Sequence, residues 1–449
     1  MASFHCEQAW LGGPVPTSDV LIETRSGTIS AVTTGVPAPV GAHRLAGLTL
    51  PGLANTHSHV FHRAIRGHTQ NGAADFWEWR NLMYAVADRL DPDTLYSLAR
   101  ATYAEMALSG VTSVGEFHYL HHGQGGVRYA DPNELGHAVT RAAHDAGLRI
   151  TLLDTCYLQG DVDGTPLAGV QRRFSDGNAQ SWADRLALLE DTNLLKVGAA
   201  IHSVRAVPRA AMVPIAETAS ARALPLHVHL SEQPAENAAC LSAFGVTPTQ
   251  LLHEEGVLGE RTTAVHATHL TDEDIQLLGR SGTSISMCCT TERDLADGVG
   301  PAVRLARAGS PLCVGSDGHT VIDLWEEARA IELDERLVTG TRGHLTIEAL
   351  LDALTAAGAA SIGWNAGRIA PGMLADLVTL RLDTPRMAGA RAGNPLNLAV
   401  FAASPADVST VVVGGSVIVE DGVHANVPDV GQALETSILA ALGGRVMVR

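Results

Sequence analysis

The sequence predicts an α/β protein, a (β/α)8 TIM-like barrel with a small β-sandwich domain formed from the N- and C-terminal segments. Short apolar runs alternate with longer amphipathic stretches through the middle of the chain, which is typical of βα units. Eight such runs over about 300 residues match the size of a (β/α)8 barrel with insertions. Both ends of the chain instead show short patterns typical of antiparallel strands.

Each of the eight apolar runs predicts one barrel strand. In chain order they are residues 48–59, 111–118, 149–155, 195–203, 225–230, 262–266, 283–290 and 311–317. Helical patterns lie between several of them, with Ser, Thr or Asp near their starts. These predicted helices cover residues 92–108, 208–223, 272–280 and 322–337.

The predicted domains follow from where these patterns change. Residues 1–50 and 371–449 are expected to form the β-sandwich domain, with a closing helix over residues 428–442. Residues 51–370 are expected to form the barrel.

Composition excludes several classes of protein. The chain carries 31 Lys and Arg against 48 Asp and Glu, a net charge of −17, which argues against nucleic acid or an anionic membrane as a partner. Its six cysteines contain no CxxC pair, which favours a reducing compartment. No secretory signal and no long apolar span are evident, so we expect a cytoplasmic protein.

Chemically active side chains follow the predicted strands. In (β/α)8 barrels the reaction takes place where the strands end. His57 and His59 end the first run, and their spacing of two places both imidazoles on one face. His229 ends the fifth run, His266 the sixth and Asp317 the eighth. Three imidazoles, a carboxylate and an open position suit one divalent ion, Zn²⁺ or Fe²⁺.

For other residues near these strand ends, the sequence predicts more limited roles. Glu232 follows the fifth strand within reach of a group on the metal. Lys196 lies near the beginning of the fourth run, so no lysine bridges a second ion there. We expect structural roles for His227, His121, His122 and Trp79.

The strand-end segments PGLANTHSH, HVHLSEQ, VHATH and GSDGH resemble the motifs of the amidohydrolase superfamily, in its mononuclear deaminase branch. This resemblance covers nearly the whole chain. It implies a metal bound by His57, His59, His229 and Asp317, and proton transfer by Glu232, His266 and Asp317.

Three further segments, FWEWRNLMY, GEFHYLHH and IHSVRAV, resemble the formimidoylglutamate deiminase family. That likeness implies hydrolysis of N-formimino-L-glutamate to N-formyl-L-glutamate and ammonia, and a homodimer. Substrate contacts are implied for Arg80, Tyr119, His202 and Arg205. Planar guanidinium groups suit a dicarboxylate substrate. The chain departs from the family at His62, where Gln is usual, so a polar substrate contact there is either kept or altered.

The implied mechanism has water on the metal lose a proton towards Asp317, helped by His266, while Glu232 protonates the leaving nitrogen. One alternative is another deaminase of this branch, acting on a purine, pterin or triazine ring. Such a pocket should favour aromatic stacking over paired arginines. The other alternative is a catalytically silent binding protein, which predicts missing ligands, and none of the six positions is missing.

Overall fold

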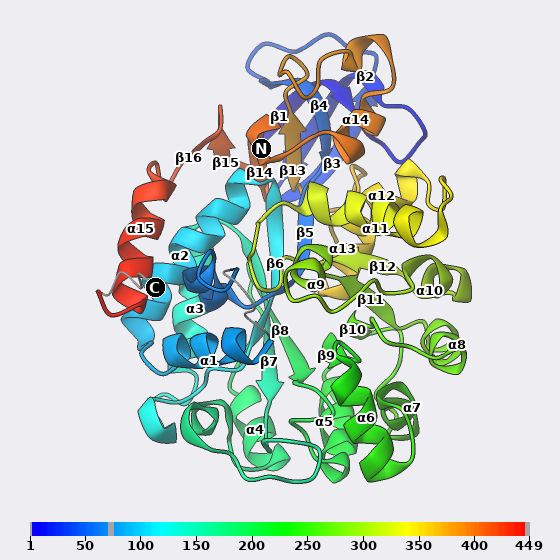
Figure 1. Cartoon of the computed structure of the whole chain (residues 1–449). Coiled ribbons are helices and arrows are strands. Elements are labelled where there is room, and N and C mark those ends of the chain that lie inside the picture. Colours follow the sequence, from blue (N-terminus) through cyan, green and yellow to red (C-terminus); the bar gives the residue numbers. More distant parts are fainter. Residues whose placement is uncertain (1, 71–75, 445–449) are drawn as a thin grey trace.

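The computed structural model describes residues 2–70 and 76–444, whose strands form two eight-stranded sheets. One sheet curls into a barrel surrounded by helices, and the other lies at one end of it (Figure 1). In the described part of the chain, no helix is both long and apolar enough to cross a membrane.

The barrel strands follow one another in chain order, and every neighbouring pair is parallel. They are β5 (Leu53–Ser58), β6 (Val111–His118), β7 (Arg149–Cys156), β8 (Leu195–Ile201), β9 (Leu226–Leu230), β10 (Thr262–His266), β11 (Ser284–Met287) and β12 (Leu312–Val314). The structure thus confirms the predicted fold class.

Several predicted strands have different limits in the structure, and in two of them the difference changes the sheet or element that the residues join. The run over residues 48–59 divides at Gly52, because β4 (His43–Pro51) belongs to the other sheet and only β5 joins the barrel. A side chain at Gly52 would come within 2.3 Å of Thr112. The run over residues 283–290 leaves the barrel after Met287, because a helix begins at Cys289.

Helices connect the barrel strands and cover the barrel (Figure 1). The helix predicted over residues 92–108 is confirmed, with Asp91 capping its first turn and proline at its first position. The helices are α1 (Phe76–Ala87), α2 (Pro92–Leu108), α3 (Glu134–Asp145), α4 (Ala179–Leu186), α5 (Arg209–Ala221), α6 (Pro234–Phe244), α7 (Pro248–Glu254), α8 (Asp272–Ser281), α9 (Cys289–Asp294), α10 (Ala302–Ala308), α11 (Leu324–Thr339), α12 (Ile347–Leu354), α13 (Ala356–Ser361), α14 (Pro395–Phe401) and α15 (Val430–Ala441).

The second sheet combines both ends of the chain, as predicted. Its strands are β1 (Ala2–Ala9), β2 (Thr17–Arg25), β3 (Thr28–Thr34), β4, β13 (Leu377–Leu380), β14 (Val408–Val413), β15 (Ser416–Glu420) and β16 (Val423–His424). Antiparallel pairing of β4 with β13 joins the N-terminal and C-terminal strands. The last helix, α15, packs on α2 beside the barrel (Figure 1).

The barrel closes between its last and first strands. Asp317 donates its backbone N–H to the His57 carbonyl at 3.0 Å, and His59 donates to the Asp317 carbonyl at 3.3 Å. Gly315 permits this approach, because a side chain there would lie 2.6 Å from the His57 Cβ. Closure of the barrel therefore brings the eighth strand end against the first.

Candidate active site

The carboxyl ends of β5, β9 and β10 and the segment after β12 meet at one mouth of the barrel. They carry His57 and His59, His229, His266 and Asp317 respectively. All five side chains are buried. The structure thus brings together every candidate ligand that the strand-end pattern singled out.

Several of these strand ends have backbone in the left-handed region. Ser231 has φ +51°, His266 φ +70° and Asp317 φ +39°. Non-glycine residues adopt such angles only where the surrounding structure holds them, and they cluster at functional sites. The backbone therefore turns sharply at the points where β9, β10 and the closing segment present their polar side chains.

Four candidate ligand atoms form a tight group. His57 Nε2 lies 3.1 Å from both Asp317 Oδ1 and His229 Nε2. His59 Nε2 lies 3.3 Å from the same two atoms. A tetrahedral ion with bonds of about 2.0–2.2 Å holds its ligands about 3.3–3.6 Å apart. The donor set and its spacing therefore fit a divalent ion.

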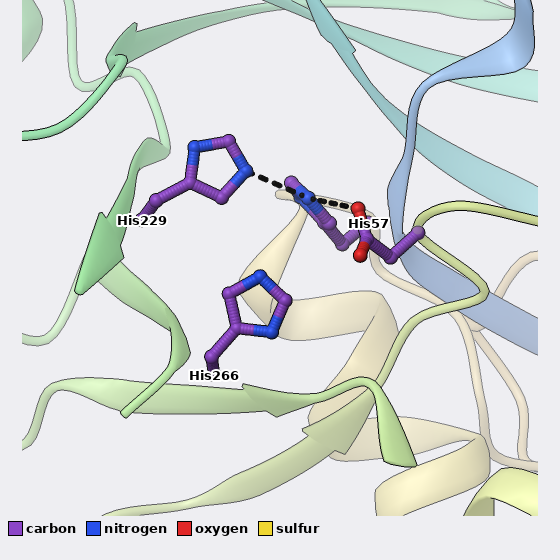
Figure 2. A group of neighbouring side chains, drawn as sticks. His57, His229 and His266 are labelled. Atoms are coloured by element: carbon purple, nitrogen blue, oxygen red, sulfur yellow. Dashed lines mark hydrogen bonds and ion pairs between the residues drawn. The ribbon is translucent and has the colours of Figure 1, made fainter. Parts of the chain in front are cut away.

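His266 lies beside this group. One ligating atom each from His57, His229, His266 and Asp317 fall within 4.8 Å of one another. Figure 2 shows the His229 and His266 rings, each from its own strand end, beside His57. The planes of the two rings are nearly parallel, at 13° to each other, with centroids 5.7 Å apart. His266 thus lies next to the four candidate ligand atoms.

The second ring nitrogens of two candidate ligands are hydrogen-bonded to backbone carbonyls. His59 Nδ1 donates to the Phe117 carbonyl at 3.0 Å, and His229 Nδ1 donates to the His202 carbonyl at 2.8 Å. These bonds select the tautomer whose Nε2 lone pair faces the group, which is the usual arrangement of metal-binding histidines.

The surroundings of the three histidines and Asp317 also shift their pKa values. Burial lowers the pKa of His57 from 6.5 to about 3, and it lowers the pKa of His59 and His229 as well. Burial alone would raise the pKa of Asp317, but its contact with His57 holds that pKa well below 3.8. Neutral imidazoles with one carboxylate are the protonation states that bind a metal.

Glu232 and His266 lie close together at the mouth as a candidate acid–base pair. His266 Nε2 lies 3.8 Å from Glu232 Oε1, and His266 Nδ1 lies 3.3 Å from Glu292 Oε1. Burial lowers the pKa of His266, but the charge of Glu232 and the contact with Glu292 outweigh it and raise that pKa to about 10. Burial raises the pKa of Glu232. His266 can therefore carry a proton near neutral pH, next to the Glu232 carboxyl group.

Sequence reasoning did not identify two buried carboxylates that support the site. Glu116 accepts the Ser58 hydroxyl at 2.6 Å and the Val60 N–H at 2.8 Å, on either side of His59. Glu292 accepts the Cys288 N–H at 3.0 Å while it contacts His266. Each lies in an ordinary helix or strand pattern, so only its three-dimensional partner reveals its role.

One cavity opens onto the candidate ligands. It is lined by His59, His229, Glu232, His266 and Asp317 together with all five predicted substrate contacts: His62, Arg80, Tyr119, His202 and Arg205. Arg80 comes from α1, whereas Arg205 follows β8. The cavity therefore combines the ligating group with two guanidinium groups from separate elements.

His62 is part of a hydrogen-bonded and aromatic wall. Its Nε2 lies 2.9 Å from the Tyr119 hydroxyl, and its ring meets Trp79 edge-on at 5.2 Å. Trp79 lines the cavity, where the sequence suggested only a packing role. Its position depends on how α1 sits over the barrel mouth, which helical periodicity does not reveal.

The remaining histidines singled out in the sequence make contacts elsewhere. His227 Nε2 lies 3.0 Å from the Ser361 carbonyl. His121 Nε2 lies 2.9 Å from the Thr155 carbonyl, and His122 Nε2 lies 3.1 Å from Asp176. All three side chains are buried outside the cavity lining.

Comparison with known proteins agrees with this geometry. The model of the amidohydrolase family matches residues 48–418. A formimidoylglutamate deiminase of Pseudomonas aeruginosa is 37% identical over 398 residues, covering 86% of this chain and 87% of the relative. An 8-oxoguanine deaminase of the same species is 32% identical, covering 84% and 83%.

A solved structure shares the whole architecture. The crystal structure of an amidohydrolase from Brucella melitensis is 30% identical, with a TM-score of 0.89, and covers 98% of this chain and 100% of that chain. Family match, relatives and fold thus point the same way. The chain belongs to the amidohydrolase family and is a hydrolase of C–N bonds.

Proposed function

We propose that this protein hydrolyses N-formimino-L-glutamate to N-formyl-L-glutamate and ammonia with the help of one zinc ion. The observation that carries the proposal is a cavity lined by three of the four candidate ligands, His59, His229 and Asp317, and by two arginines, Arg80 and Arg205. A substrate with two carboxylates needs such fixed donors. The 37% identity to a formimidoylglutamate deiminase along most of both chains supports it.

His57, His59, His229 and Asp317 are the residues proposed to hold the ion. A bound zinc ion supplies Lewis-acid activation of water near neutral pH. A donor set of imidazole nitrogens and a carboxylate oxygen also suits iron(II). The identity of the metal is therefore tested together with the substrate.

The chain's own residues then move protons. Asp317, assisted by His266, accepts the proton that the attacking water loses, and the water oxygen bonds to the formimino carbon. Glu232 transfers one proton to the terminal nitrogen, and the second water proton moves to the same nitrogen as the new hydroxyl group becomes the formyl oxygen, so that the carbon–nitrogen bond breaks to release ammonia. The proton held by Asp317 then returns to Glu232. The carbon keeps the water oxygen as the formyl oxygen, so the reaction balances with one water consumed.

Substrate positioning falls to the cavity wall. Arg80 and Arg205 bind the glutamate carboxylates, and His62, Tyr119 and His202 supply polar contacts near the formimino group. Holding the substrate in this way makes attack effectively intramolecular.

A second candidate is a deaminase of a ring substrate. The cavity also contains the aromatic side chains Trp79, Tyr119 and Phe174, which could stack against a flat ring. The 32% identity to an 8-oxoguanine deaminase favours testing this reading.

The deciding experiment measures ammonia release by zinc-loaded protein. N-formimino-L-glutamate is the test substrate, and guanine, 8-oxoguanine, adenosine and cytosine run in parallel. Release from the first substrate alone is expected. Release only from a ring substrate would overturn the proposed function. Elemental analysis of the purified protein, with zinc or iron(II) restored after chelation, identifies the metal.

A further inference from the structure

A buried carboxylate on α6 contacts one of the two arginines of the cavity. Glu236 is 1% exposed. Its Oε2 accepts from Arg205 Nε at 3.0 Å, and its Oε1 accepts the Ser231 backbone N–H at 2.9 Å. Both oxygens are therefore engaged, and each engages a residue next to the cavity.

These two contacts join separate strand ends. Arg205 follows β8, whereas Ser231 follows β9 and directly precedes Glu232. Ser231 has φ +51°, so its backbone depends on surrounding contacts to keep this turn. Glu236 thus holds a strained turn beside Glu232 and a guanidinium group in one arrangement.

The atom of Arg205 that Glu236 contacts matters for binding of a substrate carboxylate. Glu236 engages Nε, so this contact takes no donor from the two terminal nitrogens. The terminal nitrogens of arginine form the planar fork that binds a carboxylate through two parallel hydrogen bonds. An arginine held at Nε has its fork aimed before the substrate arrives.

The charge of Arg205 explains why residue 236 is a glutamate and not a glutamine. A buried carboxylate is costly unless a cation and hydrogen bonds compensate it. Burial lowers the pKa of Arg205, but the charges of Glu236 and Glu232 outweigh this effect and raise it. Arg205 therefore stays fully charged inside the protein.

We infer that Glu236 is a positioning residue that aims Arg205 at a substrate carboxylate and thereby sets the preference of the site for dicarboxylates. This inference rests on the proposed function, because it assumes that Arg205 binds a carboxylate. Glu236 itself contacts no substrate atom. It acts through the guanidinium direction and through the turn at Ser231.

The test is Glu236→Gln, which keeps the side-chain shape and an acceptor for Ser231 but removes the charge that Arg205 faces. N-formimino-L-glutamate is compared with 4-formimidamidobutanoate, which lacks the α-carboxylate, and with N-formimino-L-glutamine, which lacks the side-chain carboxylate. We expect KM for the dicarboxylate to rise about tenfold or more with kcat changed by less than about threefold. The analogue without the carboxylate bound by Arg205 should be affected little, so the dicarboxylate preference collapses.

Glu255→Gln is the matched control. Glu255 also accepts from an arginine Nε, that of Arg209 at 2.6 Å, but this pair lies away from the cavity. The control should leave both KM and the preference unchanged. Glu236→Asp, which keeps the charge and shortens the reach, serves as the second variant if Glu236→Gln does not fold, and it should give a smaller loss in the same direction.

The outcomes separate the two proposals. A wild-type protein that shows no preference for the dicarboxylate overturns the proposed function and this inference with it. A wild-type preference that survives unchanged in the Glu236 variants overturns this inference alone. An equal loss on all three substrates indicates a purely structural role and also overturns it. Calorimetric binding of N-formyl-L-glutamate, with metal content measured alongside, supplies a readout independent of turnover.

Discussion

Two of the candidate ligands, His59 and His229, are each oriented by a partner that lies far away in the sequence. His229 Nδ1 donates to the His202 carbonyl, 27 residues away, and His59 Nδ1 donates to the Phe117 carbonyl, 58 residues away. Because these partners select the tautomer, the ring nitrogens that face the ion position are determined by neighbouring strands. At the residue scale, the sequence therefore sets which side chains are present, and the fold sets how their rings are oriented.

Glu232→Gln tests the proton-transfer role at this scale. The amide keeps the shape of the side chain but cannot deliver a proton, so kcat should fall by about 10²- to 10⁴-fold. Metal content should stay at the wild-type level, because Glu232 is not among the proposed ligands. Steady-state kinetics and elemental analysis on the same preparation provide the check, and near-normal turnover would refute the role.

Glu327→Gln tests a buried acid away from the metal group. Glu327 is fully buried in α11 and accepts the Thr290 hydroxyl and backbone N–H at the start of α9. Burial raises the pKa of Glu327 well above 4.5. The folded protein therefore keeps this proton at a pH where the unfolded chain loses it, and the free energy of unfolding falls as pH rises above about 4.5.

The glutamine variant carries no such proton, so its stability relative to wild type should improve as pH increases. Urea denaturation at pH 5, 6, 7 and 8 measures this difference. A difference in unfolding free energy that stays constant across these pH values would contradict the expected linkage.

At the scale of elements, the barrel closes between β12 and β5. We call this contact the closure seam, and its residues are Gly315, Asp317, His57 and His59. Backbone hydrogen bonds between Asp317 and both histidines hold the seam together. Closure of the barrel and assembly of the ligating group are therefore one structural event.

Gly315→Ala should disturb both the closure of the barrel and the position of the candidate ligand His57. The added methyl group would lie 2.6 Å from the His57 Cβ and 3.0 Å from the His57 backbone N and O atoms. Overpacking of this kind costs about 1–3 kcal/mol, and displacement of His57 should weaken metal binding. Denaturation and a metal-competition titration measure the two effects. Gly259→Ala, which places its methyl group in open space, is the matched control, and equal behaviour of the two variants would refute the seam.

Element limits show where local patterns stop being informative. The apolar run at residues 48–59 predicts one strand, yet it contributes to two sheets, and at the break between them a side chain on Gly52 would collide with Thr112. Helix α2, by contrast, has its own cap and proline signal, and its predicted limits are those of the structure. Boundaries encoded by local hydrogen bonds could be predicted, whereas a boundary set by a distant side chain could not.

At the scale of the whole molecule, a buried ion pair ties the barrel to the second sheet. Arg149 begins β7, and its Nε lies 2.7 Å from Asp376 Oδ2, directly before β13. Asp376 Oδ1 also accepts the Gly414 N–H at 2.7 Å. This contact lies at the amino ends of the barrel strands, opposite the mouth that holds the candidate site.

Arg149→Met should therefore affect stability and not chemistry. Leaving the Asp376 carboxylate buried without its cation should lower the free energy of unfolding by about 3–5 kcal/mol. kcat/KM of the folded enzyme at 25 °C should stay unchanged. The double variant Arg149→Met with Asp376→Leu should recover part of the loss. Wild-type stability in the single variant, or a loss of activity without unfolding, would contradict this assignment.

The sequence by itself determined the alternation of strands and helices, the strand ends and the chemical identity of the candidate ligands. These are local properties, since a period of two and the strand-end rule need only neighbouring residues. His57, His59, His229, His266 and Asp317 could be named on that basis. Tertiary structure alone decided which distant groups hold them, because burial and charge pairing arise only when the chain closes. Glu116 beside Ser58, Glu292 beside His266 and Glu236 beside Arg205 are the residues that this closure revealed.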